Sequence, residues 1–150
     1  MKTKLLLILC LISGIFSYSQ QGVELKKNLY KDILNFAIKA PNLNSIGDGL
    51  EKVGFKISDT STSNDGKFIT TTYNLPDNER LLIIRAISNS SVYKIYFVQK
   101  LDISYFIIDY LGSIANTYEP NHIWYNNERT VLYSYKIDSN TGGLLELTSL

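Results

Sequence analysis

Residues 67–99 read KFITTTYNLPDNERLLIIRAISNSSVYKIYFVQ, and this stretch decides the fold. Three apolar runs, at 67–75, 80–87 and 92–99, are separated by short segments rich in Pro, Asn, Asp and Ser, which favour turns. Links this short join antiparallel neighbours, because a parallel crossover needs a dozen residues or more. The stretch therefore predicts three consecutive antiparallel strands.

An amphipathic helix is predicted before this region, over residues 24–39. Leu25, Leu29, Ile33 and Ala37 recur every four residues in it, which is the spacing of one helical face. We therefore expect these four side chains to be buried against the rest of the fold.

A second, short helix is predicted over residues 45–53. Asn44 or Ser45 is suited to cap its start, because a side-chain oxygen there accepts from a free backbone N–H. Gly54 is suited to the position after its end, because glycine tolerates positive φ.

The third predicted helix, residues 103–114, carries the broadest apolar stripe in the chain. Asp102 is its expected N-cap, and Phe106 is expected to pack on the sheet, where replacement by alanine would cost about 3–5 kcal/mol. The whole pattern predicts an α+β fold, with a mainly antiparallel sheet of six or seven strands and about three helices packed on one face. The remaining strands are predicted at 55–59, 122–126, 130–138 and 144–150.

A faint internal repeat accompanies this order of elements. The segments Leu50–Val53, Thr71–Tyr73 and Leu81–Leu82 each have a counterpart about 61 to 63 residues later, although chance similarity is the alternative. A true repeat would divide the chain into two αβββ halves, 43–100 and 102–150. The order is similar to that of the secreted β-lactamase-inhibitor proteins, in which helices cover one face of an antiparallel sheet. This similarity implies architecture only.

Residues 1–19 have the order of a secretory signal peptide: basic residues, an apolar run at 5–16 and small residues at positions 17 and 19. An uncleaved membrane anchor is the less consistent alternative, because the run makes roughly 18 Å of helix against a hydrocarbon core of about 30 Å. A lipoprotein signal is also disfavoured, because large aliphatic residues precede Cys10. We expect residues 20–150 to be a single exported domain, periplasmic or secreted, with no membrane span.

Composition narrows the classes of function. The net charge of the chain is +1, and loss of the two signal-peptide lysines takes it to about −1 without any basic run. Nucleic-acid binding is therefore not expected, because it leaves a basic footprint. Cys10 is the only cysteine, so the mature domain has no disulfide and no thiolate chemistry.

The sequence contains little that indicates catalysis. His122 is the only histidine and is interpreted as a surface or turn residue, because a zinc site needs further strong ligands. Asp48 and Glu51 lie on one helical turn and are interpreted as part of a solvated helix face, although a pair of carboxylates can hydrolyse glycosides. We expect no metal and no cofactor, and we favour a protein that is not an enzyme.

Two aromatic residues are the candidate partner-binding residues. Tyr96 and Trp124 alternate with the more apolar residues of their predicted strands, so both are expected on an exposed side. Exposed Tyr and Trp are frequent anchors in protein recognition. The function expected from the sequence is a protein-binding or accessory module whose partner is another envelope or secreted protein. The alternatives are a small hydrolase of envelope glycans and a carrier of a small apolar ligand.

Overall fold

The computed structural model describes residues 22–115, 118–119, 121–138 and 142–150. The predicted signal peptide, its cleavage point and Cys10 lie outside the described residues. Among the helices that are described, none combines the length and the apolar character needed to cross a membrane.

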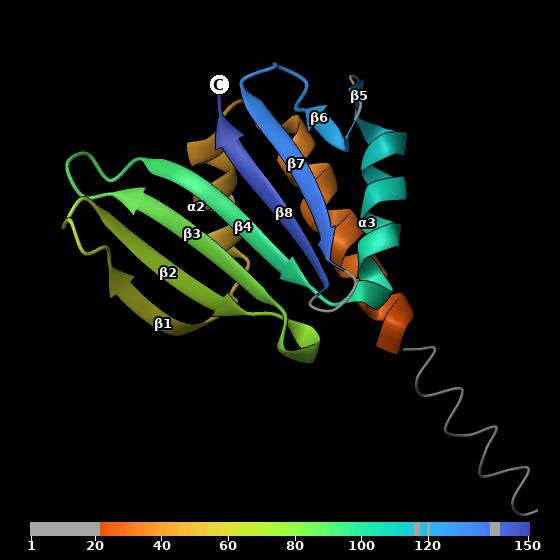
Figure 1. Cartoon of the computed structure of the whole chain (residues 1–150), viewed down its shortest axis with the longest axis horizontal. Helices are drawn as coiled ribbons and strands as arrows, with labels where there is room; N and C mark the ends of the chain where they lie inside the picture. Colours follow the sequence, from red (N-terminus) through yellow and green to blue (C-terminus); the bar gives the residue numbers. More distant parts are fainter. Residues whose placement is uncertain (1–21, 116–117, 120, 139–141) are drawn as a thin grey trace, which may run out of the picture.

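One antiparallel sheet forms the front layer of the fold, and the helices cover its back (Figure 1). The strand order is β1-β2-β3-β4-β8-β7-β6-β5, and every pair is antiparallel. The predicted α+β class is confirmed, as is the packing of the helices on one face. Seven strands have three or more residues, and β5 has two. The strands are β1 (Lys56–Thr62), β2 (Phe68–Asn74), β3 (Arg80–Ala86), β4 (Val92–Gln99), β5 (Tyr118–Glu119), β6 (Ile123–Tyr125), β7 (Val131–Asp138) and β8 (Gly142–Ser149).

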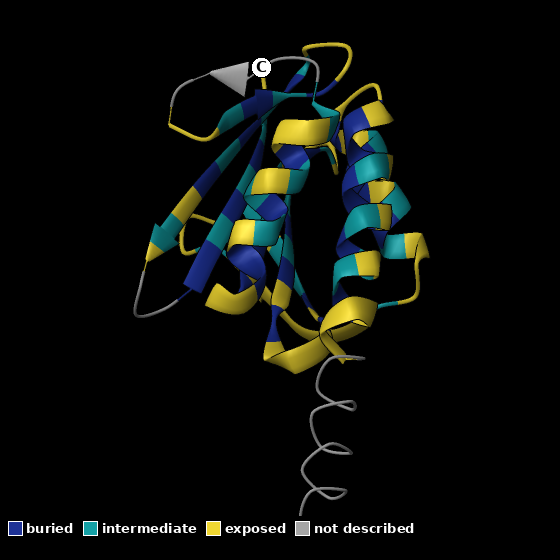
Figure 2. Ribbon diagram, turned by 90° about the vertical axis from the view of Figure 1, so that its right-hand side faces the viewer, coloured by how far each residue is buried: buried dark blue, intermediate teal, exposed yellow. Residues whose placement is uncertain are grey.

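The described helices are α1 (residues 22–39), α2 (Leu43–Lys52), α3 (Leu101–Ile114) and the one-turn η1 (Pro76–Asn78). The buried sides of helices and strands face each other, and exposed residues lie outside (Figure 2). Apolar side chains of α1, α2, α3 and the back of the sheet form one core. The sheet therefore has one covered face and one face over which none of the described helices lies.

Two meanders, β1–β4 and β5–β8, meet at the central β4–β8 pair, and each follows a helix. The sequence similarity pairs β2 with β7 and β3 with β8. In the sheet, however, β3 and β7 are the strands that lie next to the central pair on its two sides, so their positions would match β3 with β7. Duplication of the predicted halves stays a prediction, with a strand correspondence that differs from the sequence match.

The predicted buried stripe of α1 is correct in the second half of the helix and displaced by one residue in the first half. Leu25 is 71% exposed, whereas Lys26 and Tyr30 are buried together with Ile33 and Ala37. The apolar spacing was misleading because a lysine occupies the first buried position, where ionic contacts described below compensate its burial. Leu25 instead lies on the outer side of the helix.

The start of α2 also differs from the prediction. Asn42 is the N-cap, and its side chain accepts a hydrogen bond from the Ser45 backbone N–H at 2.9 Å. Asn44 accepts from the backbone N–H of Val92 at 2.6 Å and so connects the helix to β4. Gly54 has φ +88° after the helix end, as predicted.

Two glycines of α2 allow close packing. A Cβ atom on Gly47 would lie 2.7 Å from a methyl carbon of Val92, and one on Gly49 would overlap the ring of Phe36. Glycine at these positions therefore lets α2 approach both β4 and α1. This packing explains why α2 contains two glycines, although glycine has a low helix propensity.

The third helix begins at Leu101, so Asp102 lies in its first turn and is not the N-cap. Ile103 and Ile107 are buried, as the stripe predicts. Phe106 is only partly buried, with two lysines of α1 over its ring, which also stacks on Tyr110 at 5.7 Å. Phe106 was expected to be buried, whereas it is only partly buried where it packs against the core, so the cost predicted for a fully buried ring does not apply to it.

Candidate functional site

Antiparallel register sorts the side chains of the sheet onto two faces. Successive residues of a strand point to opposite faces, and residues paired across strands share a face. Leu81 and Leu145 are fully buried on the helix side. Their neighbours Leu82 and Leu144 therefore lie on the opposite side, over which none of the described helices passes (Figure 1). We call this side the open face.

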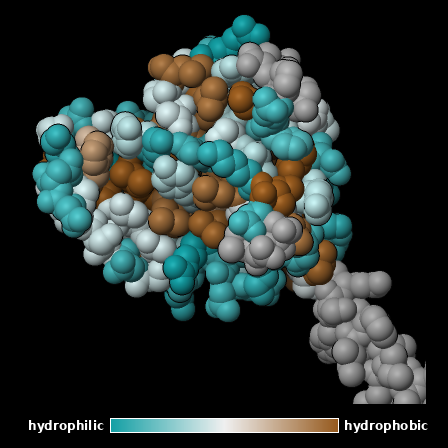
Figure 3. All heavy atoms as spheres, viewed as in Figure 1, coloured by the Kyte–Doolittle hydropathy of each residue, from teal (hydrophilic) through white to brown (hydrophobic). Residues whose placement is uncertain are grey.

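Three rows of paired residues cross the open face from β3 to β7, and two of them reach β6. More than half of their side chains are aliphatic or aromatic, and apolar side chains gather in a band across this face (Figure 3). The rows are Arg80, Val98, Leu144 and Lys136; Leu82, Tyr96, Glu146, Ser134 and Ile123; and Ile84, Lys94, Thr148, Leu132 and Tyr125.

An ion pair lies at the centre of the open face. Lys94 Nζ is 2.5 Å from Glu146 Oε1, and the Thr148 hydroxyl donates to the same oxygen at 3.2 Å. The hydrogen bond to Glu146 raises the pKa of Lys94. The ammonium group also lies 5.9 Å from the ring centre of Tyr96, within the range of a cation–π contact. These contacts hold both charged groups in place. The side chains around the pair on the open face are mainly apolar.

Tyr96 lies on the open face with Lys94 and Val98, as strand alternation predicted. It is half-buried rather than fully exposed, because Leu82 and Glu146 flank it on the neighbouring strands. Its phenol ring is therefore part of the apolar band. A role in partner binding stays a prediction for this residue.

Trp124 is 1% exposed, so the expectation of an exposed side chain was wrong. It pairs in register with Tyr133, which is fully buried on the helix side, and Ile123 and Tyr125 point to the open face instead. The reason is tertiary: α3 passes over β6 and covers its tryptophan side, where Gly112 approaches the indole. Trp124 cannot touch a partner in this conformation.

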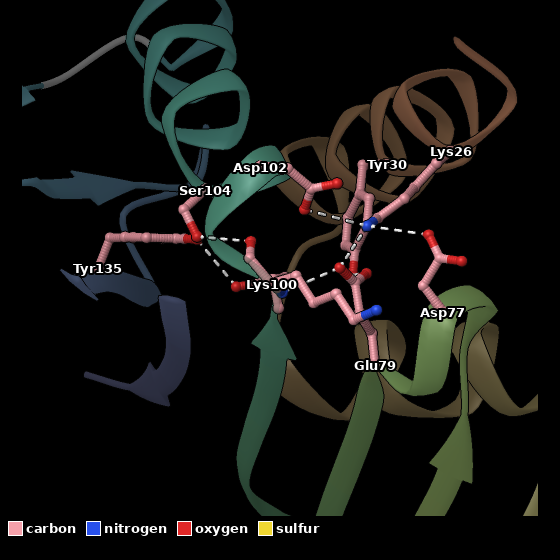
Figure 4. A network of polar contacts seen from close by, with 9 residues as sticks. Lys26, Tyr30, Asp77, Glu79, Lys100, Asp102, Ser104 and Tyr135 are labelled. Atoms are coloured by element: carbon pink, nitrogen blue, oxygen red, sulfur yellow. Dashed lines mark hydrogen bonds and ion pairs between the residues drawn. The ribbon is translucent and has the colours of Figure 1, made fainter. Parts of the chain in front are cut away.

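A buried ionic cluster joins α1 to the start of β3 and the start of α3 (Figure 4). Lys26 Nζ lies 2.7 Å from Glu79 Oε1, and the side chains of both residues are at most 2% exposed. Asp77 and Asp102 lie 3.3 and 3.4 Å from the same ammonium nitrogen. The Tyr30 hydroxyl donates to Glu79 Oε2 at 2.6 Å. We call these five residues the ionic cluster.

The ionic cluster has the properties of a structural anchor. Burial alone lowers the pKa of Lys26, but Glu79, with Asp102 and Asp77, outweighs it, and the pKa lies above its ordinary value. Burial and the neighbouring Glu79 also raise the pKa of Tyr30 strongly. Lys26 is therefore a poor nucleophile and Tyr30 a poor acid at neutral pH. Glu79 also accepts from the backbone N–H of Lys100 at 3.0 Å, so its carboxylate is well satisfied.

The helical carboxylates Asp48 and Glu51 share one partner. Arg85 Nη2 lies 2.7 Å from Asp48 Oδ1 and 3.2 Å from Glu51 Oε2. Both carboxylates thus connect α2 to β3 through a guanidinium group. This arrangement gives them a structural role and occupies with a cation the carboxylates that a hydrolytic pair would use.

His122 is exposed in a turn with φ +58°, and its ring stacks on Trp124 at 6.0 Å. Its interpretation as a turn residue is confirmed. In the part of the chain that the structure describes, no group of three or more His, Cys, Asp and Glu side chains is arranged to hold a metal ion.

Sequence reasoning missed the two sets of charged residues that now stand out. Arg80 and Lys136 could have been placed on the open face, because each alternates with a buried apolar residue of its strand. The burial of Lys26 with Glu79 could not be predicted, because the sequence around each residue does not indicate that two charges 53 positions apart pack together.

The chain matches no protein-family model, and no curated protein and no solved structure gives a significant match. Fold and side-chain geometry are therefore the basis for the function proposed next.

Proposed function

We propose that the chain is an exported protein-binding module and that its open face is the docking surface for another envelope or secreted protein. The observation that carries this proposal is the composition of the open face. An antiparallel sheet can expose one face to water when that face is polar. Here aliphatic and aromatic side chains occupy most of the three rows, and contiguous apolar surface of this kind is characteristic of interaction sites.

The geometry of the open face suits a protein partner. Side chains on adjacent strands lie about 4.8 Å apart, so the five strands from β3 to β6 present a surface roughly 20 Å wide. Such a surface can accept a helix or a sheet edge of another protein, since elements stack in layers to bury apolar faces. Tyr96 near its centre has the aromatic character of an interface anchor.

The hydrolase alternative receives less support. Its most plausible carboxylate pair, Asp48 and Glu51, is engaged by Arg85. The ionic cluster holds its lysine and tyrosine in their protonated forms and leaves neither ready for acid–base catalysis. A carrier of an apolar ligand has one supporting feature, a hollow of about 380 Å³ between α1 and α2 that includes Phe36 and Val53.

The test combines capture of a partner with matched variants. The exported protein is immobilised and exposed to envelope extract, and any partner is then purified and its binding measured directly. We expect Tyr96→Ser and Val98→Asp to weaken binding at least roughly tenfold, as interface anchors do. Tyr105→Ser is the control, because Tyr105 is 62% exposed on α3, away from the open face. All variants are first shown to retain the melting temperature of the wild type within a few degrees.

Two results would contradict the proposal. Binding that Tyr96→Ser and Val98→Asp leave unchanged, but that Phe36→Ser abolishes, would move the site to the hollow between α1 and α2. A small apolar molecule retained in native mass spectrometry, together with the absence of any protein partner, would favour the carrier instead.

A further inference from the structure

The first row of the open face has a charge pattern that the other rows lack. Arg80 on β3 and Lys136 on β7 flank Val98 and Leu144 on the two strands between them. We call these four residues the cationic row. Lys100 follows Val98 by two residues in extended backbone, which places a third cation on the same face.

These cations have no partner among the described acidic side chains. Arg80, Lys100 and Lys136 form none of the ion pairs found in the described residues, whereas Lys94 in the third row is paired with Glu146. Unpaired exposed cations around an apolar patch attract acidic surfaces and disfavour basic ones. The cationic row is therefore complementary to a partner that is both apolar and acidic.

The surface is also hollowed beside the cationic row. A depression of about 370 Å³ is lined by Val98, Leu144 and the stem of Lys136, with Gly143 and Asp138 at its side. Asp138 is the one acidic residue among its described lining residues. The volume can accept a branched apolar side chain, and the apolar floor favours such a group.

We propose that the cationic row binds a partner segment that carries one apolar side chain between two carboxylates, a proposal that rests on the protein-binding function given above. The spacing follows from the sheet. Arg80 and Lys136 are three strand intervals apart, which is about 14 Å at about 4.8 Å per interval. An extended segment rises about 3.3 Å per residue, so two acidic residues four positions apart span about 13 Å. The residue midway between them points to the same side and meets Val98 and Leu144.

The segment thus has the pattern acidic-x-apolar-x-acidic when it is extended across the strands. Exposed ion pairs contribute little affinity each, so their main effect is on the choice of partner and on the rate of association. The apolar side chain supplies the anchor, and the two carboxylates fix the register of the segment across the strands.

The experiment titrates ¹⁵N-labelled exported protein with three blocked pentapeptides and follows the amide chemical shifts. The probes are Asp-Ser-Leu-Ser-Asp, Lys-Ser-Leu-Ser-Lys and Asp-Ser-Ser-Ser-Asp. We expect only the first to shift amides around Val98 and Leu144 at millimolar concentration. Arg80→Gln and Lys136→Gln should each weaken this binding by roughly twofold to fivefold, the range of an exposed ion pair. Lys67→Gln, at a lysine 74% exposed and outside the open face rows, should leave it unchanged.

Several results would overturn the inference. The inference is wrong if the lysine peptide shifts the same amides as strongly as the aspartate peptide, or if the shifts map to the hollow between α1 and α2. Absence of any shift at 5 mM of the first peptide, a high concentration for a site of roughly millimolar affinity, would also refute it. If a purified partner still binds the open face in that case, the proposed function stands and only the acidic–apolar specificity fails. Shifts at the cationic row that depend on protein concentration alone would identify a second copy as the occupant.

Discussion

The ionic cluster provides the most direct test of what holds α1 on the sheet. We consider Glu79→Gln, Lys26→Met and the double variant, with unfolding free energies measured by urea denaturation. Glu79→Gln leaves a buried ammonium whose remaining partners, Asp77 and Asp102, are more than half exposed. Lys26→Met leaves a buried carboxylate that, among the described residues, keeps the Tyr30 and Lys100 donors.

Removal of one partner of a buried ion pair costs about 3–5 kcal/mol, because the other charge stays desolvated. We expect about 3 kcal/mol for each single variant. The double variant removes both charges, so its cost should be far below the sum, about 2 kcal/mol. A domain of this size should lose roughly 10 °C in melting temperature in either single variant.

An exposed ion pair of the same chain is the control. Lys67 and Asp65 lie 3.7 Å apart, with side chains 74% and 51% exposed. Lys67→Met should change the unfolding free energy by less than about 0.5 kcal/mol. The reasoning would be refuted if the two single changes at the ionic cluster cost less than about 1 kcal/mol each and were additive in the double variant.

Three further predictions concern pH, backbone and processing. Burial raises the pKa of Tyr135 to about 12, above the value near 10 in the unfolded chain. Its contribution to stability is therefore complete below pH 10 and declines by about 2 kcal/mol as the pH rises towards 12. Tyr135→Phe should flatten this decline in alkaline denaturation, and an unchanged slope would contradict the prediction. Gly142→Ala should lower the unfolding free energy by more than about 2 kcal/mol in thermal unfolding, because φ is +103° there and a Cβ would overlap the Gln99 carbonyl oxygen. Gly66→Ala is the control and should lower it less, because Gly66 is also at positive φ but has no close neighbours. Mass spectrometry of the native protein should find a mature N-terminus at residue 20 or 21, and an intact first residue would contradict export by cleavage.

Most strands were predictable because their signals are local. The alternation in Lys94, Tyr96 and Val98, and the turn residues on either side of each run, depend only on neighbours along the chain. The observed strands lie within a few residues of the predicted ones, with the two-residue β5 as the addition. The covered sheet face was also predictable, since an amphipathic helix needs an apolar surface to pack against.

The buried sides of two elements were not predictable in this way. The position of Lys26 in the buried stripe of α1 depends on Glu79, and Trp124 is buried because α3 passes over β6. Each case involves residues of different elements, so the periodicity within one element has no information about it. For the same reason the sequence could indicate Tyr96 but not the pair Arg80 and Lys136. These two residues lie on the same face of the sheet, on either side of β4 and β8.

The sequence by itself determined the α+β class, the short antiparallel links and the alternation that assigns side chains to faces. These features follow from turn chemistry and from the periods of helix and strand, which act over a few residues. Only the tertiary structure decided that β4 pairs with β8, that the ionic cluster anchors α1 and that Trp124 is buried under α3. The physical reason is that burial and ion pairing are set by the neighbours in space, which the order of residues along the chain does not specify.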